Sequence, residues 1–267
     1  MKYALIILAF IALTTRAHSQ ESFEGNSSGL LTKLDALIAA YPEYLSHHDG
    51  KILVWHDGTQ MQISDGRTNK RFEDLLNSPD IDDMFTFEYP AGAEPNAPDL
   101  NEDPGRIRYE PLFVKMYGDC RKGEVAKKMR TVRWLPTHGG GNLQVTTVNG
   151  VAEALEKVSA ELDKLPDRLV RFLIPAGGTY NCRVIAGTRR YSAHAFGAAI
   201  DINVKSAHYW LWTQPDAKNR YQWRNQIPLE IIDIFEKHGF IWGGRWYHFD
   251  TMHFEYRPEF FLIRQIE

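Results

Sequence analysis

The stretch that decides both fold and chemistry is residues 191–203, which read YSAHAFGAAIDIN. Its end alternates like a strand, with one face formed by Ala199, Asp201 and Asn203 and the other by Ile200, Ile202 and Val204. Alternation with a period of two predicts a strand that buries its apolar face. A carboxylate flanked by bulky apolar residues is costly to bury unless it is paired or binds a metal. The pattern therefore predicts a partner for Asp201.

His194 is the candidate partner, because it precedes Asp201 in the same stretch. The small residues Gly197, Ala198 and Ala199 between them would let the chain fold back, so that the imidazole reaches the carboxylate. Taken alone, a His and an Asp at this spacing are more typical of a surface histidine and a turn aspartate. The pair needs a second segment to indicate a site.

The second segment is residues 250–256, DTMHFEY, in which Asp250 lies three positions before His253. If this segment ends in a strand, His253 and Glu255 share one face while Phe254 and Tyr256 pack into the core. Two histidines, one aspartate and a further acid suit a catalytic zinc, because three protein ligands leave a position for water and the acid takes its proton. Zinc lowers the pKa of such a water to roughly 7.

Together the two segments resemble the M15 zinc peptidases. The shared motifs are S-x-H-x-x-G-x-A-x-D at residues 192–201 and D-x-x-H-F-E at residues 250–255. This family comprises D-alanyl-D-alanine carboxypeptidases and dipeptidases related to vancomycin resistance, and L-alanyl-D-glutamate endopeptidases of phage lysins. The run G-F-x-W-G-G-x-W at residues 239–246 resembles the endopeptidase-like branch in particular. The resemblance covers residues 176–256, and it does not account for the N-terminal part.

The resemblance implies a role for each matched residue. The expected Zn²⁺ ligands are His194, Asp201 and His253, and Asp250 is the expected general base; some family members carry Glu at that place. The family also has an arginine upstream of the first histidine that steadies the developing oxyanion, a task that suits a planar, permanently charged group. Arg183 fits that place best, with Arg189 and Arg190 as competitors. Ser192 and Glu255 are expected beside the ligands or against substrate, whereas His248 lies outside the pattern.

The expected fold class is α+β, with a small central antiparallel sheet, the zinc on its open face and helices behind, as in the DD-peptidase and hedgehog-like zinc proteins. An N-terminal helix and hairpin would extend it. The expected division is a signal peptide at 1–19, an N-terminal extension at 20–106 and a peptidase domain at 107–267. Periodicity predicts helices over 30–41, 151–162 and 228–239, a hairpin of 52–55 with 61–63, and strands over 145–148 and 169–174.

The N-terminus carries the pattern of a secretory signal. After Lys2, residues 3–13 are almost wholly apolar, and Ala17-His18-Ser19 is a small-x-small cleavage pattern. The apolar run is too short to span a bilayer of about 30 Å as a permanent helix. We therefore expect an exported protein, periplasmic or secreted, without stable membrane insertion.

Composition bounds the partners and the redox chemistry. A net charge of -3 over 267 residues gives no argument for a nucleic-acid partner, and we expect a monomer that acts on the peptides of peptidoglycan. Two cysteines, Cys120 and Cys182, are the smallest number that can form a disulfide, which export permits. Two unrelated buried thiols are the alternative.

Three alternatives concern function. Within the enzyme class, the chain is either a carboxypeptidase that removes terminal D-Ala or an endopeptidase that cuts inside the stem peptide. Outside it, the chain is a non-catalytic zinc-containing cell-wall-binding protein. A third possibility is a non-peptidase zinc protein on the same fold, as in some signalling domains, because fold alone does not fix function.

Overall fold

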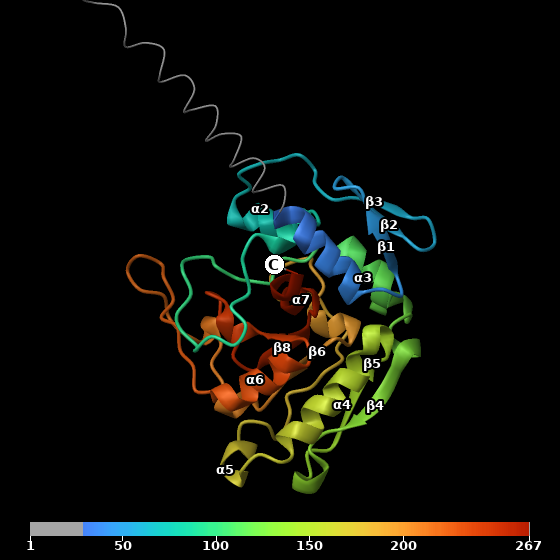
Figure 1. Ribbon diagram of the computed structural model, residues 1–267. Helices are drawn as coiled ribbons and strands as arrows, with labels where there is room; N and C mark the ends of the chain where they lie inside the picture. The colour runs from blue at the N-terminus through green and yellow to red at the C-terminus, as the bar shows by residue number, and fades with distance from the viewer. Residues whose placement is uncertain (1–28, 267) are drawn as a thin grey trace, which may run out of the picture.

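The computed structural model describes residues 29–266, so the predicted signal peptide lies outside the described residues. The described part is a mixed α+β structure with three small antiparallel sheets (Figure 1). One sheet belongs to the N-terminal part, one pairs with the long helix α4 (Val151–Leu162), and one carries the C-terminal part. Buried side chains from all three parts form one hydrophobic cluster. The structure thus has several small sheets where the sequence predicted a single central one.

The N-terminal part begins with a helix over residues 29–40, as the leucine spacing predicts. Its residues Leu34 and Leu37 are fully buried, because positions three apart lie on one helical face. The predicted hairpin is present and gains a third strand; the strands are β1 (Leu45–His48), β2 (Ile52–Trp55) and β3 (Gln60–Gln62). A short helix, α2 (Phe72–Asn77), follows.

Residues 89–106 form a long connection without helix or strand, as their content of Pro, Gly, Asn and Asp predicts. This connection packs on the C-terminal part: Tyr89 donates a hydrogen bond of 2.7 Å to the buried Glu236 of α6 (Leu229–Lys237). The chain then forms α3 (Glu110–Tyr117). The irregular connection is therefore held in place by buried polar contacts.

The middle of the chain is a two-stranded sheet covered by α4. Its strands β4 (Met129–Arg133) and β5 (Asn142–Thr146) are antiparallel, and α4 buries its apolar face against them. The strand predicted at 145–148 is thus β5, which begins and ends earlier than predicted.

The prediction of a strand over residues 169–174 is wrong. Pro166 instead precedes a short helix, α5 (Asp167–Val170), and turns follow it. The apolar residues Leu169, Phe172 and Leu173 have the spacing of one helical face, and all three are buried. Six apolar-rich residues do not distinguish strand from helix by pattern alone, and the proline favours a helical start.

The C-terminal sheet has the order β6–β8–β7, with strands β6 (Ala199–Asp201), β7 (Phe240–Trp242) and β8 (His253–Tyr256). Helix α6 lies behind it: Phe235 stacks on Phe254 of the central strand, with ring centroids 3.8 Å apart. The chain ends with α7 (Glu259–Ile266), which Figure 1 shows next to the N-terminal helix. Ile200 and Ile202 are fully buried as predicted, but β6 ends at Asp201, and Val204 turns outward.

None of the helices in residues 29–266 combines the length and the apolar character needed to cross a membrane.

Candidate active site

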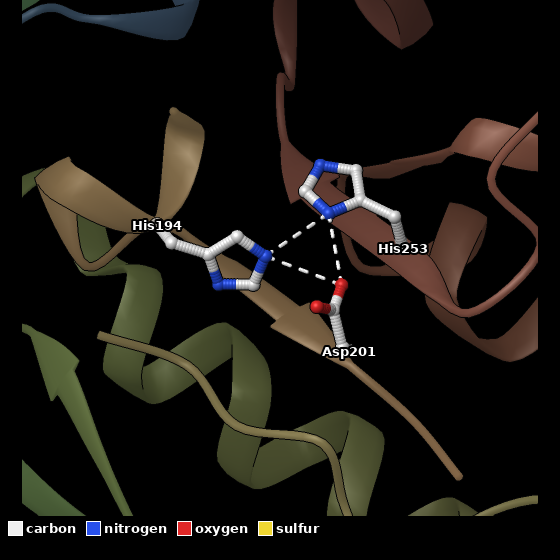
Figure 2. A group of neighbouring side chains, drawn as sticks. All are labelled: His194, Asp201 and His253. Carbon is white, nitrogen blue, oxygen red and sulfur yellow. Dashed lines mark hydrogen bonds and ion pairs between the residues drawn. The ribbon is translucent and has the colours of Figure 1, made fainter. Parts of the chain in front are cut away.

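Three side chains converge on the open face of the C-terminal sheet: His194, Asp201 and His253 (Figure 2). One ligand atom of each lies within 4.8 Å of the others. The Asp201 Oδ1 atom is 3.2 Å from His194 Nε2 and 3.0 Å from His253 Nδ1, and the two ring nitrogens are 3.2 Å apart. Strand pairing explains part of this, because Asp201 of β6 lies directly opposite His253 of β8.

A one-turn 3₁₀ helix, Ala193–Phe196, carries His194 to the cluster. The chain leaves this turn through Gly197 at a φ of 67°, a conformation that glycine adopts without steric cost, and enters β6. The small residues of this stretch thus do fold the chain back as predicted. The Nδ1 atom of His194 lies 2.5 Å from the carbonyl oxygen of Thr179, which can only accept a hydrogen bond. This contact fixes the proton on Nδ1 and leaves the Nε2 lone pair facing the cluster.

His253 faces the cluster with its Nδ1 atom, whereas His194 faces it with Nε2. The Nε2 atom of His253 lies 3.2 Å from the Glu255 carboxylate, because period-two alternation along β8 puts both side chains on one face. The proton therefore sits on Nε2, and the Nδ1 lone pair faces Asp201 and His194. The cluster presents two nitrogen lone pairs and one carboxylate oxygen to a common point.

The charges around the cluster favour a cation at its centre. Burial alone would raise the pKa of Asp201; without a metal, an imidazole that carries a second proton on its inner nitrogen donates it to Asp201, and such hydrogen bonds from His194 and His253 hold the pKa below its usual value. Burial lowers the pKa of His253, yet hydrogen bonds with Asp201 and Glu255 raise it to about 10. The carboxylates thus stabilise positive charge on or beside this imidazole. A metal ion would supply that charge in place of the proton.

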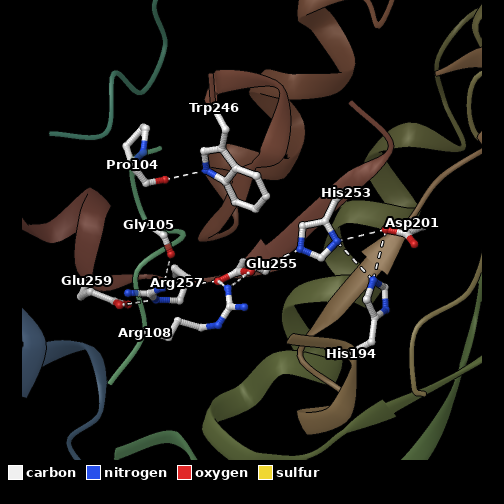
Figure 3. Close-up of polar contacts among 10 residues, drawn as sticks. All are labelled: Pro104, Gly105, Arg108, His194, Asp201, Trp246, His253, Glu255, Arg257 and Glu259. Carbon is white, nitrogen blue, oxygen red and sulfur yellow. Dashed lines mark hydrogen bonds and ion pairs between the residues drawn. The ribbon is translucent and has the colours of Figure 1, made fainter. Parts of the chain in front are cut away.

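Glu255 is itself held by two arginines (Figure 3). Arg108 donates to it at 2.8 Å and 3.2 Å, and Arg257 donates at 3.3 Å. Burial would raise the pKa of Glu255, but Arg108 and the other positive neighbours lower it well below its usual value. Arg257 continues the chain of contacts to Glu259, which accepts a hydrogen bond of 2.7 Å from the Tyr41 hydroxyl. The His253 imidazole is thus connected through buried charges to the N-terminal part.

Asp250 lies in the same pocket and is half-buried, and one of its carboxylate oxygens, Oδ1, is buried without a hydrogen-bond partner. Burial raises the pKa of this carboxyl to about 6, with attraction to His253 opposing the rise. The backbone is fixed by a hydrogen bond from the Asp250 N–H to the Gly243 carbonyl. A Cβ atom at Gly243 would lie 2.6 Å from the Asp250 carbonyl oxygen, so only glycine permits this approach.

Arg183 lies on the pocket wall, at the start of an irregular hairpin that returns to Ser192. The Ser192 N–H donates to the Arg183 carbonyl at 3.1 Å, and both residues line the pocket beside His194. Its competitors lie elsewhere: Arg189 is exposed, and Arg190 is half-buried beside Arg108, outside the pocket lining. Desolvation and the positive charge of Arg108 lower the pKa of Arg190 to about 10.

The two cysteines form a disulfide, Cys120–Cys182. The bond ties the residue directly before Arg183 to the segment that follows α3, 62 positions earlier in the chain. Of the two possibilities left open by the sequence, the structure contains the disulfide. It anchors the base of the hairpin that presents Arg183.

The pocket has a volume of about 120 Å³ and contains residues that sequence reasoning did not find. Arg106 and Arg108 reach it from the end of the irregular connection, and Tyr209 pairs through its backbone with Asp250. No local pattern marks any of them. His248 also lines the pocket, but its Nδ1 forms a hydrogen bond of 2.8 Å with the Asp103 Oδ2 atom. His248 lies outside the cluster of His194, Asp201 and His253.

A family model matches the part of the chain that contains most of this site. Residues 186–256 match the family model described as D-alanyl-D-alanine carboxypeptidase, from the M15 peptidases. We call residues 186–256, which match this model, the M15 segment. It contains the three clustered ligands and Asp250, whereas Thr179, Arg183 and Arg108 precede it. No curated protein and no solved structure matches the chain.

The donor set of the M15 segment fits zinc. Zinc is bound by histidine nitrogens and carboxylate oxygens, and catalytic zinc sites use three protein ligands. The two imidazoles have their outer N–H groups on a carbonyl and a carboxylate, the arrangement that orients metal-binding histidines. The buried Oδ1 of Asp250 has no hydrogen-bond partner in the protein, so it is free to bind a water molecule or a substrate group in the pocket.

Proposed function

We propose that this chain is an exported zinc-dependent peptidase that hydrolyses peptide bonds in the stem peptides of peptidoglycan. One observation carries the proposal: a cluster of three residues that could hold a metal and the buried, unpartnered Oδ1 of Asp250 line the same pocket within the M15 segment. A likeness to the DD-peptidase and hedgehog-like zinc fold is part of this proposal, supported by the sheet β6–β8–β7 that carries the ligands.

The chemistry divides among the residues of the pocket. A zinc ion held by His194, Asp201 and His253 would polarise the substrate carbonyl and activate a water molecule for attack. Asp250 accepts the proton of the attacking water and delivers it to the leaving amine, and its burial, which raises the pKa of the carboxyl, makes it a better proton acceptor than an exposed aspartate. Arg183 stabilises the negative charge that develops on the carbonyl oxygen. The oriented imidazoles keep the ligand geometry fixed during the reaction.

The charges along the pocket wall bear on which peptide bond is cut. The pocket wall carries the guanidinium groups of Arg106, Arg108 and Arg183, and the first two already pair with Asp103 and Glu255. Arg183 makes no ion pair within the described residues, so its guanidinium is the pocket cation open to a substrate that ends in a carboxylate. This favours a D-Ala-D-Ala carboxypeptidase over an L-Ala-D-Glu type endopeptidase.

We also propose where the protein acts and in what oligomeric state. We infer a monomer in the periplasm or outside the cell, without stable membrane insertion and with no nucleic-acid partner. The disulfide supports this, because disulfides persist in oxidising compartments. The competing function, a non-catalytic zinc-containing wall-binding protein, gives no role to Asp250, and a purely structural zinc has four protein ligands.

The test is zinc content measured beside digestion of purified peptidoglycan, for the wild type and for Asp250→Ala. We expect one zinc per chain in both proteins and release of new amino groups by the wild type alone. Product masses then separate removal of terminal D-Ala from cleavage within the stem. Zinc binding without cleavage by the wild type would favour the wall-binding protein, and loss of zinc from Asp250→Ala would make Asp250 a ligand instead of a base.

A further inference from the structure

Two large hydrophobic side chains are exposed next to each other in a turn beside the pocket. Of the large hydrophobic residues exposed in residues 29–266, Leu211 and Trp212 are the pair that is adjacent in sequence. Leu211 is 52% exposed and Trp212 is 58% exposed, and Trp212 is the one aromatic residue in this exposed set. A single exposed hydrophobic residue is common on protein surfaces, but two adjacent ones next to a pocket form a small apolar surface that a ligand in the pocket can reach.

This surface is continuous with the pocket. Trp210–Trp212 form a single 3₁₀ turn, and Tyr209 and Trp210 at its start line the pocket. The Tyr209 ring packs edge-on against Trp212, with centroids 5.7 Å apart, while the Tyr209 backbone pairs with Asp250. The exposed Trp212 indole therefore lies next to the pocket wall, with Tyr209 between it and Asp250, the proposed base.

The turn that presents Trp212 is firmly held. Trp210 packs edge-to-face against Tyr221 and His248, each with centroids 4.7 Å apart. Its backbone N–H donates to the Phe249 carbonyl at 2.9 Å, and that of Trp212 donates to Tyr209 at 2.9 Å. A fixed aromatic surface binds a ligand at a lower entropic cost than one on a loose segment.

The size of the surface restricts its partner. Leu211 and Trp212 cover far less than the roughly 800 Å² that each partner buries in a stable protein complex. They also lack the extended apolar face of a helix that lies on a membrane. One planar indole with a leucine beside it matches a single sugar ring, whose C–H face is apolar and whose edge carries hydroxyl and amide groups.

We propose that Leu211 and Trp212 form a subsite for an N-acetylhexosamine unit of the glycan strand to which the stem peptide is attached. The proposal deepens the proposed function and rests on it. In peptidoglycan the sugar lies next to the peptide by covalent attachment, as the subsite lies next to the pocket. The enzyme would therefore act on peptides still carried by glycan in preference to free peptides.

The first test measures binding of a tetramer of N-acetylglucosamine to the zinc-loaded full-length protein by chemical-shift perturbation. This probe contains no stem peptide, so its binding does not depend on whether the protein is a peptidase. We expect Trp212→Ala to weaken binding about tenfold and Trp212→Tyr to retain most of it. Leu31→Ala, which removes an exposed leucine from the N-terminal helix, is the matched control and should bind as the wild type does. No binding by the wild type, or equal binding by Trp212→Ala, would overturn the proposal.

The second test compares cleavage of polymeric peptidoglycan with cleavage of the same stem peptide free in solution. For Trp212→Ala we expect the ratio of the two rates to fall about tenfold, through KM for the polymer. An equal loss on both substrates would show that Trp212 only shapes the pocket. Sedimentation with phosphatidylglycerol vesicles that depends on Trp212, in place of sugar binding, would assign the surface to a membrane and refute the glycan subsite.

Discussion

Residues 186–256 and residues 29–110 contribute to the site in different ways. The first region supplies the three clustered residues that could hold a metal and Asp250, and it matches a known family. The second lies outside the residues that match this family, yet Arg108 contacts Glu255, and Tyr41 and Tyr89 donate to buried glutamates of the C-terminal part. The groups proposed to carry the chemistry are close in sequence, while those that hold them come from far along the chain. Four predictions test this division of labour, in order of expected effect on the reaction.

The largest effect is expected on removing a ligand from the M15 segment. His194→Ala should lose zinc and reduce peptide hydrolysis by about 10³-fold or more, because the metal contributes several kcal/mol to the transition state. Zinc content by mass spectrometry and a peptide-release assay measure both. His248→Ala is the control, since His248 lies in the same pocket outside the cluster. Retained zinc in His194→Ala would remove this residue from the ligand set.

Arg183 should come next, because it precedes the M15 segment but lines its pocket. Arg183→Ala should lower kcat about 10²-fold while zinc stays bound, as expected for loss of a group that acts on the oxyanion. Arg189→Ala, which alters an exposed arginine of the same hairpin, is the matched control. If the two variants lose activity equally, the hairpin and not the Arg183 guanidinium is what matters.

Arg108 tests whether the N-terminal contacts reach the metal. Arg108→Ala leaves Glu255 with one arginine fewer, so it should weaken zinc affinity by about 10- to 100-fold, the usual cost of losing a group that supports a ligand. Competition with a chelator measures the affinity. Arg130→Ala is the control, because the half-buried Arg130 pairs with two exposed glutamates far from the proposed ligands in sequence. Unchanged zinc affinity in Arg108→Ala would limit the role of this arginine to structure.

The smallest effect on the reaction is expected at Asp103, where stability should change instead. Asp103 is fully buried and pairs with Arg106 and His248. Burial would raise its pKa, but Arg106 and His248 lower it below its usual value. Its stabilising contribution is therefore complete above the unfolded-state pKa of about 4 and is lost as pH falls through the lower folded-state pKa.

Asp103→Asn should accordingly lower the free energy of unfolding by about 3 kcal/mol at neutral pH, because it leaves buried positive charge without its partner. Thermal unfolding between pH 2 and 7 measures the difference. The gap between wild type and variant should narrow toward the acid end of that range. A gap that is constant with pH would mean that the carboxylate charge is not what stabilises the connection.

Most of the proposed site follows from the sequence, because its information is local. Period-two alternation put His253 and Glu255 on one face of a strand, and the small residues after His194 allowed the chain to turn back. The helices and the hairpin also follow from local periodicity. The prediction of a strand over residues 169–174 was wrong because six residues are too few for their apolar pattern to distinguish the period of a strand from that of a helix.

Tertiary structure decided what has no local pattern. Arg108 and Glu255 are 147 positions apart and Tyr41 and Glu259 are 218 apart, so no spacing rule could pair them. The Thr179 carbonyl that sets the His194 proton is a backbone group, and its contact leaves no trace in residue type. The exposure of Trp212 depends on what the rest of the chain leaves uncovered. The sequence determined which groups can bind a metal, and the fold decided their protonation, their support and the surface beside them.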